Sequence, residues 1–559
     1  MTPLLRYLRT VVPALAIATV LLVGAAAQTH AHEQAAPAAA GKAPVFDLGK
    51  WHHAVTTSSA EAQKYFDQGL NLAYGFNHAQ AAIAFDEAAR IDPECAMAYW
   101  GKALVLGPNI NMPMDSTADT PAWDAIQKAV ALAPKASPAE RRYIMALSAR
   151  YSDPKAAARP TRTALDSAYA NAMREVWKQA PEDADAGTLF AEALMDLNPW
   201  NFWSLDGKAA PGTDEILSTL EAALVIAPNN PGANHYYIHA LEASPNPERA
   251  VPAAERLGGL VPQAGHLVHM PGHIWHRIGR YGDAENVNVK AARVDSLYVA
   301  KYHPQSVYPM MYYPHNVHFI WSSACFGGRG AAALRAARRL EPMVPAEMVR
   351  QMPPVEFASP TTYYTLVRFG RWADVLKQPA PPADLRFTTG MWHYARGLAY
   401  AAGGQLEPAA AERDSVEAIA KATPADAIVS FNSSAALLRL AGQALAGEIA
   451  AKQGRTDEAV DHFRAAIKEE DALHYDEPPA WYLPVRQQLG AVMLAAGRAN
   501  EAEIEYREDL RRHPENGWSL FGLAKALRAR KADAEAAEVE ARFKTAWARA
   551  DTKLTDSRF

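Results

Sequence analysis

The stretch "AQKYFDQGLNLAYGFNHAQAAIAFDEAARIDP" (Ala62–Pro93) indicates the fold class of this 559-residue chain. Small and aromatic residues fall in it at the offsets of a two-helix repeat of about 34 residues. Gly69 and Ala81 mark where two helices approach closely, and Phe85 fills the gap to the next hairpin. Pro93 ends the second helix, because proline lacks the backbone donor that a continuing helix needs.

The same offsets recur in the last third of the sequence. One copy contains Gly447, Ala459 and Phe463, and another contains Gly490 and Tyr506. Turn signals separate segments of helical periodicity along the whole chain, and no segment has the alternation of a convincing strand. Since such hairpins bury their apolar faces only by stacking, the sequence predicts an all-α solenoid of about a dozen hairpins.

This pattern resembles the tetratricopeptide repeat (TPR) family from about residue 60 to residue 547. Phrases such as "CAMAYWGKALVLGPNIN" and "GANHYYIHALEAS" also resemble those of exported bacterial TPR proteins. The resemblance implies a TPR-like α-solenoid, a superhelix whose concave groove binds ligands, and it implies no reaction. Aromatic or Pro-rich insertions at residues 198–213 and 298–312 interrupt the repeats.

The chain therefore divides into six expected segments. They are a signal peptide (1–27), a low-complexity linker (28–58), N-terminal helical repeats (59–183), central repeats with insertions and a His-rich groove (184–343), irregular helical repeats (344–430) and C-terminal TPR repeats (431–559). Arg6 and Arg9 before the apolar run ending at Ala27 are typical of a secretory signal. An uncleaved anchor is the alternative, because the run is at the short end for a membrane span. We expect a periplasmic or secreted protein with no membrane contact after cleavage.

Composition limits the classes of partner and of chemistry that are expected. A net charge of −5 gives no basic surface, so no nucleic-acid partner is expected. The two cysteines, Cys95 and Cys325, are too far apart in a solenoid to meet, and we expect buried free thiols. The sequence contains no P-loop, GxSxG elbow, HExxH motif or dinucleotide fingerprint.

The segment "GHLVHMPGHIWHRIGRYGDA" (Gly265–Ala284) holds four of the 18 histidines. Their spacing keeps them on one face of a helix: His266, His269, His273 and His276. A repeat frame beginning at Gly265 puts all four on the positions that, as the resemblance implies, face the concave groove. Pro271 either bends this helix or starts a new one with Met270 outside it.

The neighbouring repeats add residues to the same stretch of groove. A frame beginning at Pro231 places three side chains on the same face: His235, His239 and Glu242. A frame beginning at Met311 places Tyr312 and His315 there, with His318 facing the partner helix.

This concentration of imidazoles predicts a transition-metal site. The i, i+4 pairs His235/His239 and His269/His273 are the best candidate ligands, because that spacing lets both rings reach one ion. The other groups would be further ligands or would orient the ligands: His266, His276, His315, Glu242 and Tyr312. Imidazole ligands suit copper, zinc or iron. The alternative is a polar groove that binds an anionic ligand or a peptide.

Two weaker features lie nearby. Glu192 and Asp196 are spaced i, i+4 and either extend the metal site or form a solvated helix face. The aromatic stretch from Asn198 to Gly207 is either a lid over the groove or a staple in the stack.

Two functions of different class remain open. One is a metal-binding protein that acts as a metal-dependent oxidase or hydrolase on a small molecule or an extended substrate. The other is a scaffold that binds a peptide or protein partner without catalysis. Concentration of the histidines in one region favours the first, since a scaffold would distribute its specificity residues over several repeats.

Overall fold

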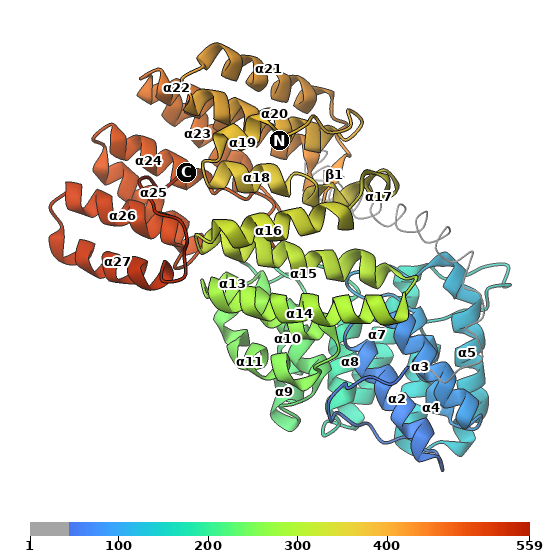
Figure 1. Ribbon diagram of the computed structural model, residues 1–559. Helices are drawn as coiled ribbons and strands as arrows, with labels where there is room; N and C mark the ends of the chain where they lie inside the picture. The colour runs from blue at the N-terminus through green and yellow to red at the C-terminus, as the bar shows by residue number, and fades with distance from the viewer. Residues whose placement is uncertain (1–43) are drawn as a thin grey trace, which may run out of the picture. The chain divides into compact units, whose positions relative to one another are not determined.

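The structure is a computed structural model that describes residues 44–559, and its regular elements are almost all helices (Figure 1). The predicted all-α, TPR-like solenoid class is confirmed. The expected signal peptide (1–27) and residues 28–43 of the expected linker lie outside the described residues. No helix between residues 44 and 559 is both long enough and apolar enough to cross a membrane.

The described chain forms two compact units. The first unit comprises residues 44–274 and 290–313, and the second unit comprises residues 275–289 and 314–559. The region 184–343, grouped as one segment in the sequence, is therefore divided between them.

The helices of the first unit run in chain order as consecutive hairpins. They are α2 (Ala60–Ala73), α3 (His78–Ile91), α4 (Ala96–Leu106), α5 (Asp119–Leu132), α6 (Pro138–Ser148), α7 (Arg162–Gln179), α8 (Ala184–Met195), α9 (Thr213–Ile226), α10 (Pro231–Glu242), α11 (Val251–Leu260) and α12 (Gly265–His269). Residues of both units occur in α13 (Pro271–Arg277), α14 (Tyr281–Tyr302) and α15 (Val307–Phe326).

The second unit continues the series. Its helices are α16 (Gly330–Leu340), α17 (Ala346–Gln351), α18 (Thr361–Arg368), α19 (Trp372–Leu376), α20 (Arg386–Ala402), α21 (Leu406–Ala422), α22 (Ser434–Lys452), α23 (Thr456–Glu470), α24 (Val485–Ala495), α25 (Ala499–Arg512), α26 (Gly517–Ala529) and α27 (Asp533–Ala546). Short 3₁₀ helices occur at η1 (Ser116–Ala118), η2 (Ala133–Lys135), η3 (Pro247–Ala250), η4 (Glu341–Met343) and η5 (Pro353–Ala358).

The prediction that no strand forms is wrong at one place. Strand β1 (Ile428–Val429) pairs antiparallel with β2 (Asn432–Ser433), with Ile428 opposite Ser433. Each strand has two residues, which is too short to produce the alternating pattern by which a strand is recognised in a sequence.

Aromatic rings wedged between glycines hold the hairpins together, as the repeat pattern predicts. The Phe85 ring on α3 lies against Gly69 of α2 and Gly101 of α4, so a Cβ at either glycine would collide with it. Tyr506 on α25 lies in the same way between Gly490 of α24 and Gly522 of α26. Each ring therefore packs against the first helix of its own hairpin and the first helix of the next one.

The insertions differ from each other. Residues 198–213 are mainly loop, whereas most of residues 298–312 belong to the end of α14 and the start of α15. The repeat frame at Met311 thus falls inside α15, which begins at Val307. Both cysteine thiols are buried and free, as predicted.

Candidate metal centre

Helix α10 carries three of the predicted site residues on one face. Its first turn is fixed by Asn230, whose side chain accepts a hydrogen bond from the Ala233 amide at 2.8 Å, and by Pro231 at the first helical position. The i, i+4 spacing then brings His235 and His239 to the same side, with ring centroids 4.7 Å apart. Both imidazoles are almost completely buried.

The four-histidine segment is not one continuous helix. Helix α12 ends at His269, Met270 separates the two helices, and α13 begins at Pro271. The alternative in which a new helix starts at Pro271 is therefore confirmed. Proline fits the first position of a helix, because the backbone nitrogen there makes no hydrogen bond within the helix.

The start of α12 is held by a carboxylate of the same unit. A Cβ at Gly265 would collide with the Asp295 side chain, so only glycine allows α12 to pass this close to α14. Tyr308 donates a hydrogen bond to Asp295 at 3.1 Å and accepts one from the His266 amide at 2.9 Å. These contacts fix the position from which the His266 ring projects.

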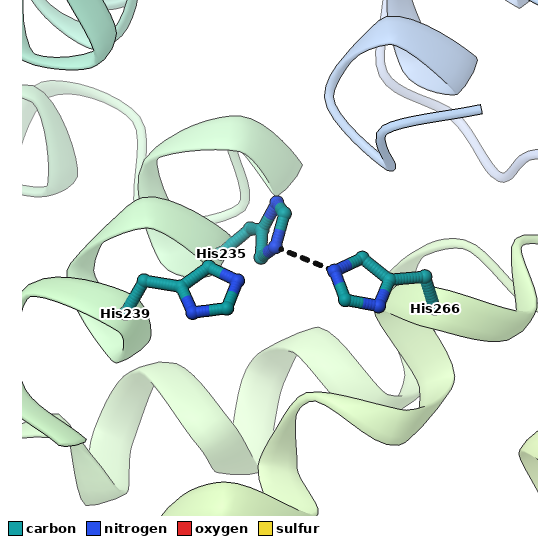
Figure 2. A group of neighbouring side chains, drawn as sticks. All are labelled: His235, His239 and His266. Atoms are coloured by element: carbon teal, nitrogen blue, oxygen red, sulfur yellow. Dashed lines mark hydrogen bonds between the residues drawn. The ribbon is translucent and has the colours of Figure 1, made fainter. Parts of the chain in front are cut away.

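Three imidazoles meet in the first unit, two from α10 and one from α12 (Figure 2). One ring nitrogen from each of His235, His239 and His266 lies within 4.8 Å of the others. The Nε2 atoms of His235 and His266 are 3.1 Å apart. Four ligands around a tetrahedral zinc ion with bonds of ~2.0–2.1 Å lie ~3.3 Å from one another, so this separation needs little adjustment to hold an ion.

The tautomers of the two α10 histidines follow from their other ring nitrogens. His235 Nδ1 lies 2.6 Å from the Tyr74 carbonyl, which can only accept, so Nδ1 carries the proton and Nε2 a lone pair. His239 Nδ1 lies 2.6 Å from Glu242 Oε1, which assigns the same tautomer to His239. His239 Nε2 is buried and has no hydrogen-bond partner among residues 44–559.

Glu242 joins this group to a second pair of histidines. Its second carboxylate oxygen pairs with Nδ1 of His273 on α13, while Nε2 of His273 lies 2.8 Å from Nε2 of His269. One buried carboxylate thus orients one imidazole of the three-histidine group and one of the pair, an arrangement common around metal-bound histidines.

Burial and charge set the protonation states. Burial lowers the pKa of His235 well below its ordinary value, and the neighbouring His239 lowers it further. Burial also lowers the pKa of His239, although Glu242 opposes the change. Burial alone would raise the pKa of Glu242, but His273 and His239 hold it below its usual range. The centre therefore has neutral α10 imidazoles beside an ionised carboxylate, as metal ligands require.

The structure places the remaining predicted residues as follows. Tyr312 flanks the group, with its ring centroid 4.5 Å from that of His266 and its hydroxyl accepting a hydrogen bond from Asn111. His276 and His315 belong to the second unit, where His276 lies 3.1 Å from the Ser322 hydroxyl and His315 packs on Phe319. His318 stacks on Trp321 and is buried, in accordance with its expected inward position.

Glu192 lies in a different cluster. Glu192 is buried on α8, and the side chain of Asp196, directly after α8, is buried in an ion pair with the guanidinium of Arg150. The alternative that these carboxylates form a solvated helix face is therefore wrong. Since burial and Asp196 raise the pKa of Glu192, the cluster is a proton-sharing pair beside an arginine.

The expectation of an open groove at these histidines is corrected by their burial. The exposed fraction of His235, His239 and His266 is between 0% and 2%. Two aromatic residues that the repeat frame did not identify cover them. The Phe76 ring lies 4.6 Å from His235, 5.6 Å from His266 and 5.9 Å from His239, and Trp200 lies edge-on to His239 at 5.2 Å.

Trp200 comes from the aromatic insertion, which passes over α10. The indole nitrogen of Trp203 donates to the Ala240 carbonyl at 2.7 Å, and Phe202 is buried. The insertion therefore forms part of the wall of the histidine group, and its own aromatic residues were the sequence signal that pointed to such a role. Nothing in the sequence pointed to Phe76, which lies about 160 residues upstream of His235.

No protein-family model and no curated protein matches the sequence. Among solved structures, the chain is similar to the human IFIT1 dimer with m7Gppp-AAAA, with 13% identity, a TM-score of 0.31 and coverage of 88% of this chain and 91% of that chain. The human IFIT1 dimer with PPP-AAAA gives 13% identity, a TM-score of 0.29 and coverage of 87% and 91%. The ligands in those structures concern IFIT1, and at this similarity they say nothing of what the present chain binds.

Proposed function

We propose that this protein binds a transition-metal ion through His235, His239 and His266. The observation that carries the proposal is the buried Nε2 of His239, which has no partner in the described chain and belongs to an imidazole grouped with those of His235 and His266. A buried polar atom without a hydrogen bond costs free energy, and a bound ion would remove that cost.

The metal-free tautomers support the same conclusion. His235 and His239 both present lone pairs, so only His266 can donate into the group, and its Nε2 reaches His235. The lone pair on Nε2 of His239 is then left without a hydrogen-bond donor. An ion accepts all three lone pairs if His266 moves its proton to Nδ1, and Glu242 supplies the charge that strengthens His239 as a ligand.

Three imidazoles leave one position of a tetrahedral ion for water or a small ligand, which is the pattern of catalytic zinc sites. The proposed activity is therefore a metal-dependent oxidation or hydrolysis of a small molecule, since the aromatic cover excludes an extended chain from the ion. The metal is copper, zinc or iron. We also propose that the protein is exported, on the basis of the charged and apolar N-terminal run.

Metal analysis of the full chain, purified without a chelator or a metal-affinity column, tests this proposal. We expect near-stoichiometric metal in the wild type, loss of most of it in His235→Ala/His266→Ala, and retention in His393→Ala. His393 is the matched control, because it also bonds a glutamate but lies in the second unit. X-ray absorption should show nitrogen ligands at ~2.0–2.1 Å.

Two results would overturn the proposal. One is wild-type protein that contains no metal and whose thermal stability does not change on addition of zinc, copper or iron. The other is equal metal content in the double variant and the wild type. If the double variant does not fold, the same measurement is made on His239→Gln. Glutamine keeps a polar side chain at this position but removes the unpartnered Nε2 that would bind the ion. If the protein is instead a scaffold that binds a peptide or protein partner without metal, these variants would still bind that partner.

A further inference from the structure

The second unit buries an arginine that has no counter-charge. Arg368 is the last residue of α18 and is 1% exposed. Its Nε and Nη1 atoms make no hydrogen bond, and the guanidinium forms no ion pair with any carboxylate in the described chain. Arginine stays protonated in proteins, so it cannot avoid this cost by losing its proton.

The groups packed on the guanidinium do not neutralise it. Its central carbon lies 3.7 Å above the Trp518 ring, a stacking contact that leaves the N–H groups in the guanidinium plane unused. The Cys325 thiol acts on Arg368, but burial raises the pKa of this thiol to about 12, so it carries no charge at neutral pH. Asp509 also acts on Arg368, but its oxygens already accept hydrogen bonds from four side chains: Gln487, Asn516, Ser519 and His513.

Further unused donors accumulate in the same aromatic cluster. Tyr364 lies one turn before Arg368 on α18, and its ring stacks on Tyr482 with centroids 4.0 Å apart. Tyr482 is adjacent in sequence to Trp481, whose ring centroid lies 5.5 Å from that of Tyr394. All four side chains are buried, and the Tyr364 hydroxyl and the Trp481 indole have no hydrogen-bond partner within residues 44–559. The hydroxyls of Tyr394 and Tyr482 lie close enough to interact with each other.

Hydrogen-bond donors beside a positive charge suit an anion, whereas the imidazole lone pairs of the candidate metal centre suit a cation. Arg368 supplies two unused N–H groups, and the Tyr482 hydroxyl, which interacts electrostatically with the guanidinium, can donate to the same acceptor. A buried unpaired charge destabilises a protein strongly, whereas a partner that accepts these hydrogen bonds would reverse the cost.

We infer that the second unit binds a small monovalent anion, a halide or a carboxylate, between the Arg368 guanidinium and the hydroxyl of Tyr482. Near-complete burial of both residues restricts the ligand to a small ion. This site stands independently of the proposed metal centre, because no residue is shared between them.

Thermal unfolding of the full chain at constant ionic strength tests the inference, with sodium chloride or sodium acetate replacing sodium gluconate from 1 to 100 mM. We expect the melting temperature of the wild type to rise by roughly several degrees with at least one of the two probes. Arg368→Met should abolish the rise, and Tyr482→Phe, which keeps the stacked ring, should reduce it. Arg371→Met is the matched control, since Arg371 is an exposed arginine three residues away, and it should behave like the wild type.

Bromide soaked into crystals gives the second readout. An anomalous peak in contact with the Arg368 guanidinium in the wild type, absent in Arg368→Met, supports the site. The inference is overturned if water alone occupies this position and the melting temperature of the wild type follows that of Arg368→Met at every anion concentration. A rise that persists unchanged in Arg368→Met also overturns it, because the anion then acts elsewhere.

Discussion

The carboxylate of Glu242 lies 2.6 Å from Nδ1 of His239, and its other oxygen pairs with a second histidine, His273. Glu242 therefore accepts two N–H donors at once. A glutamine in its place offers one oxygen and one amide N–H group, so one of the two histidines would face a donor and would have to change its tautomer.

We expect Glu242→Gln to weaken metal binding by about 10–100-fold without removing a ligand, because partners that orient metal-bound histidines have effects of this size. Competition with a chromophoric chelator measures the affinity. Glu412→Gln is the control, since Glu412 also accepts from a histidine, His393, but in the second unit. Equal affinities for the Glu242→Gln variant and the wild type would contradict the orienting role.

His318 predicts an acid-sensitive second unit. Burial lowers the pKa of this imidazole to about 3, whereas the unfolded chain has its ordinary value of about 6.5. Because the pKa is lowered in the folded state, the buried neutral imidazole of His318 contributes its full stability above pH 6.5, and this stability is lost as the pH falls toward 3.

The variant His318→Phe keeps the ring that stacks on Trp321 and removes the titration. Relative to the wild type, it should gain about 2 kcal/mol in free energy of unfolding between pH 6.5 and pH 5, by linkage at ~1.4 kcal/mol per pH unit. Urea unfolding at pH 5 and pH 7.5 measures this difference. A difference between the proteins that is the same at both pH values would show that the pKa of His318 is not lowered in the folded state.

The Glu192–Asp196 pair predicts the opposite pH dependence. Burial raises the pKa of Asp196 to about 6, with Arg150 opposing the change, and burial raises that of Glu192 well above its ordinary value. Raised values mean that stability is complete below the pKa of the unfolded carboxyls and is lost as the pH rises through that of the folded ones.

Glu192→Gln should therefore stabilise the protein at pH 8 relative to pH 5, by at most ~1.4 kcal/mol per pH unit, because the amide requires no buried proton. Chemical denaturation at the two pH values measures it. Glu175→Gln, on the exposed face of α7, provides the control. If Glu192→Gln destabilises the protein equally at both pH values, Glu192 is ionised and balanced by Arg150.

The packing of Phe85 on Gly69 predicts a large effect from a single methyl group. A Cβ at Gly69 would lie 2.6 Å from the Phe85 ring, so Gly69→Ala should destabilise the first unit by about 1–3 kcal/mol through overpacking. Gly259→Ala, in α11, has no atom near the added Cβ and should be neutral or slightly stabilising. Thermal unfolding of both variants separates packing from helix propensity. Equal melting temperatures for Gly69→Ala and Gly259→Ala would contradict the tight packing of Phe85 on Gly69.

The sequence predicted the solenoid because its signals are local. The glycine and aromatic offsets that define a hairpin, such as Gly69 and Phe85, reflect contacts within one repeat and its neighbour. The same frame placed the first residues of α10 and α12 at Pro231 and Gly265, where both helices begin.

The candidate site was predictable only at the level of helix faces. The frame placed His235, His239 and His266 on neighbouring faces but did not show which ring nitrogens meet, since that depends on side-chain rotation and on the break at Met270. The burial of the rings depends on Phe76, whose contact with them no repeat offset describes. Pairings across more than one repeat leave no periodic trace in a sequence.

The wedged rings also determine how local unfolding propagates along the chain. Phe85 and Tyr506 each fill space in two successive hairpins, so neither hairpin has a complete interior of its own. When one hairpin opens, its neighbour loses a wall and exposes an aromatic ring to water. Unfolding therefore advances from an opened hairpin to the next in line, and a protease cut at a hairpin boundary leaves a fragment whose new end tends to associate with other chains.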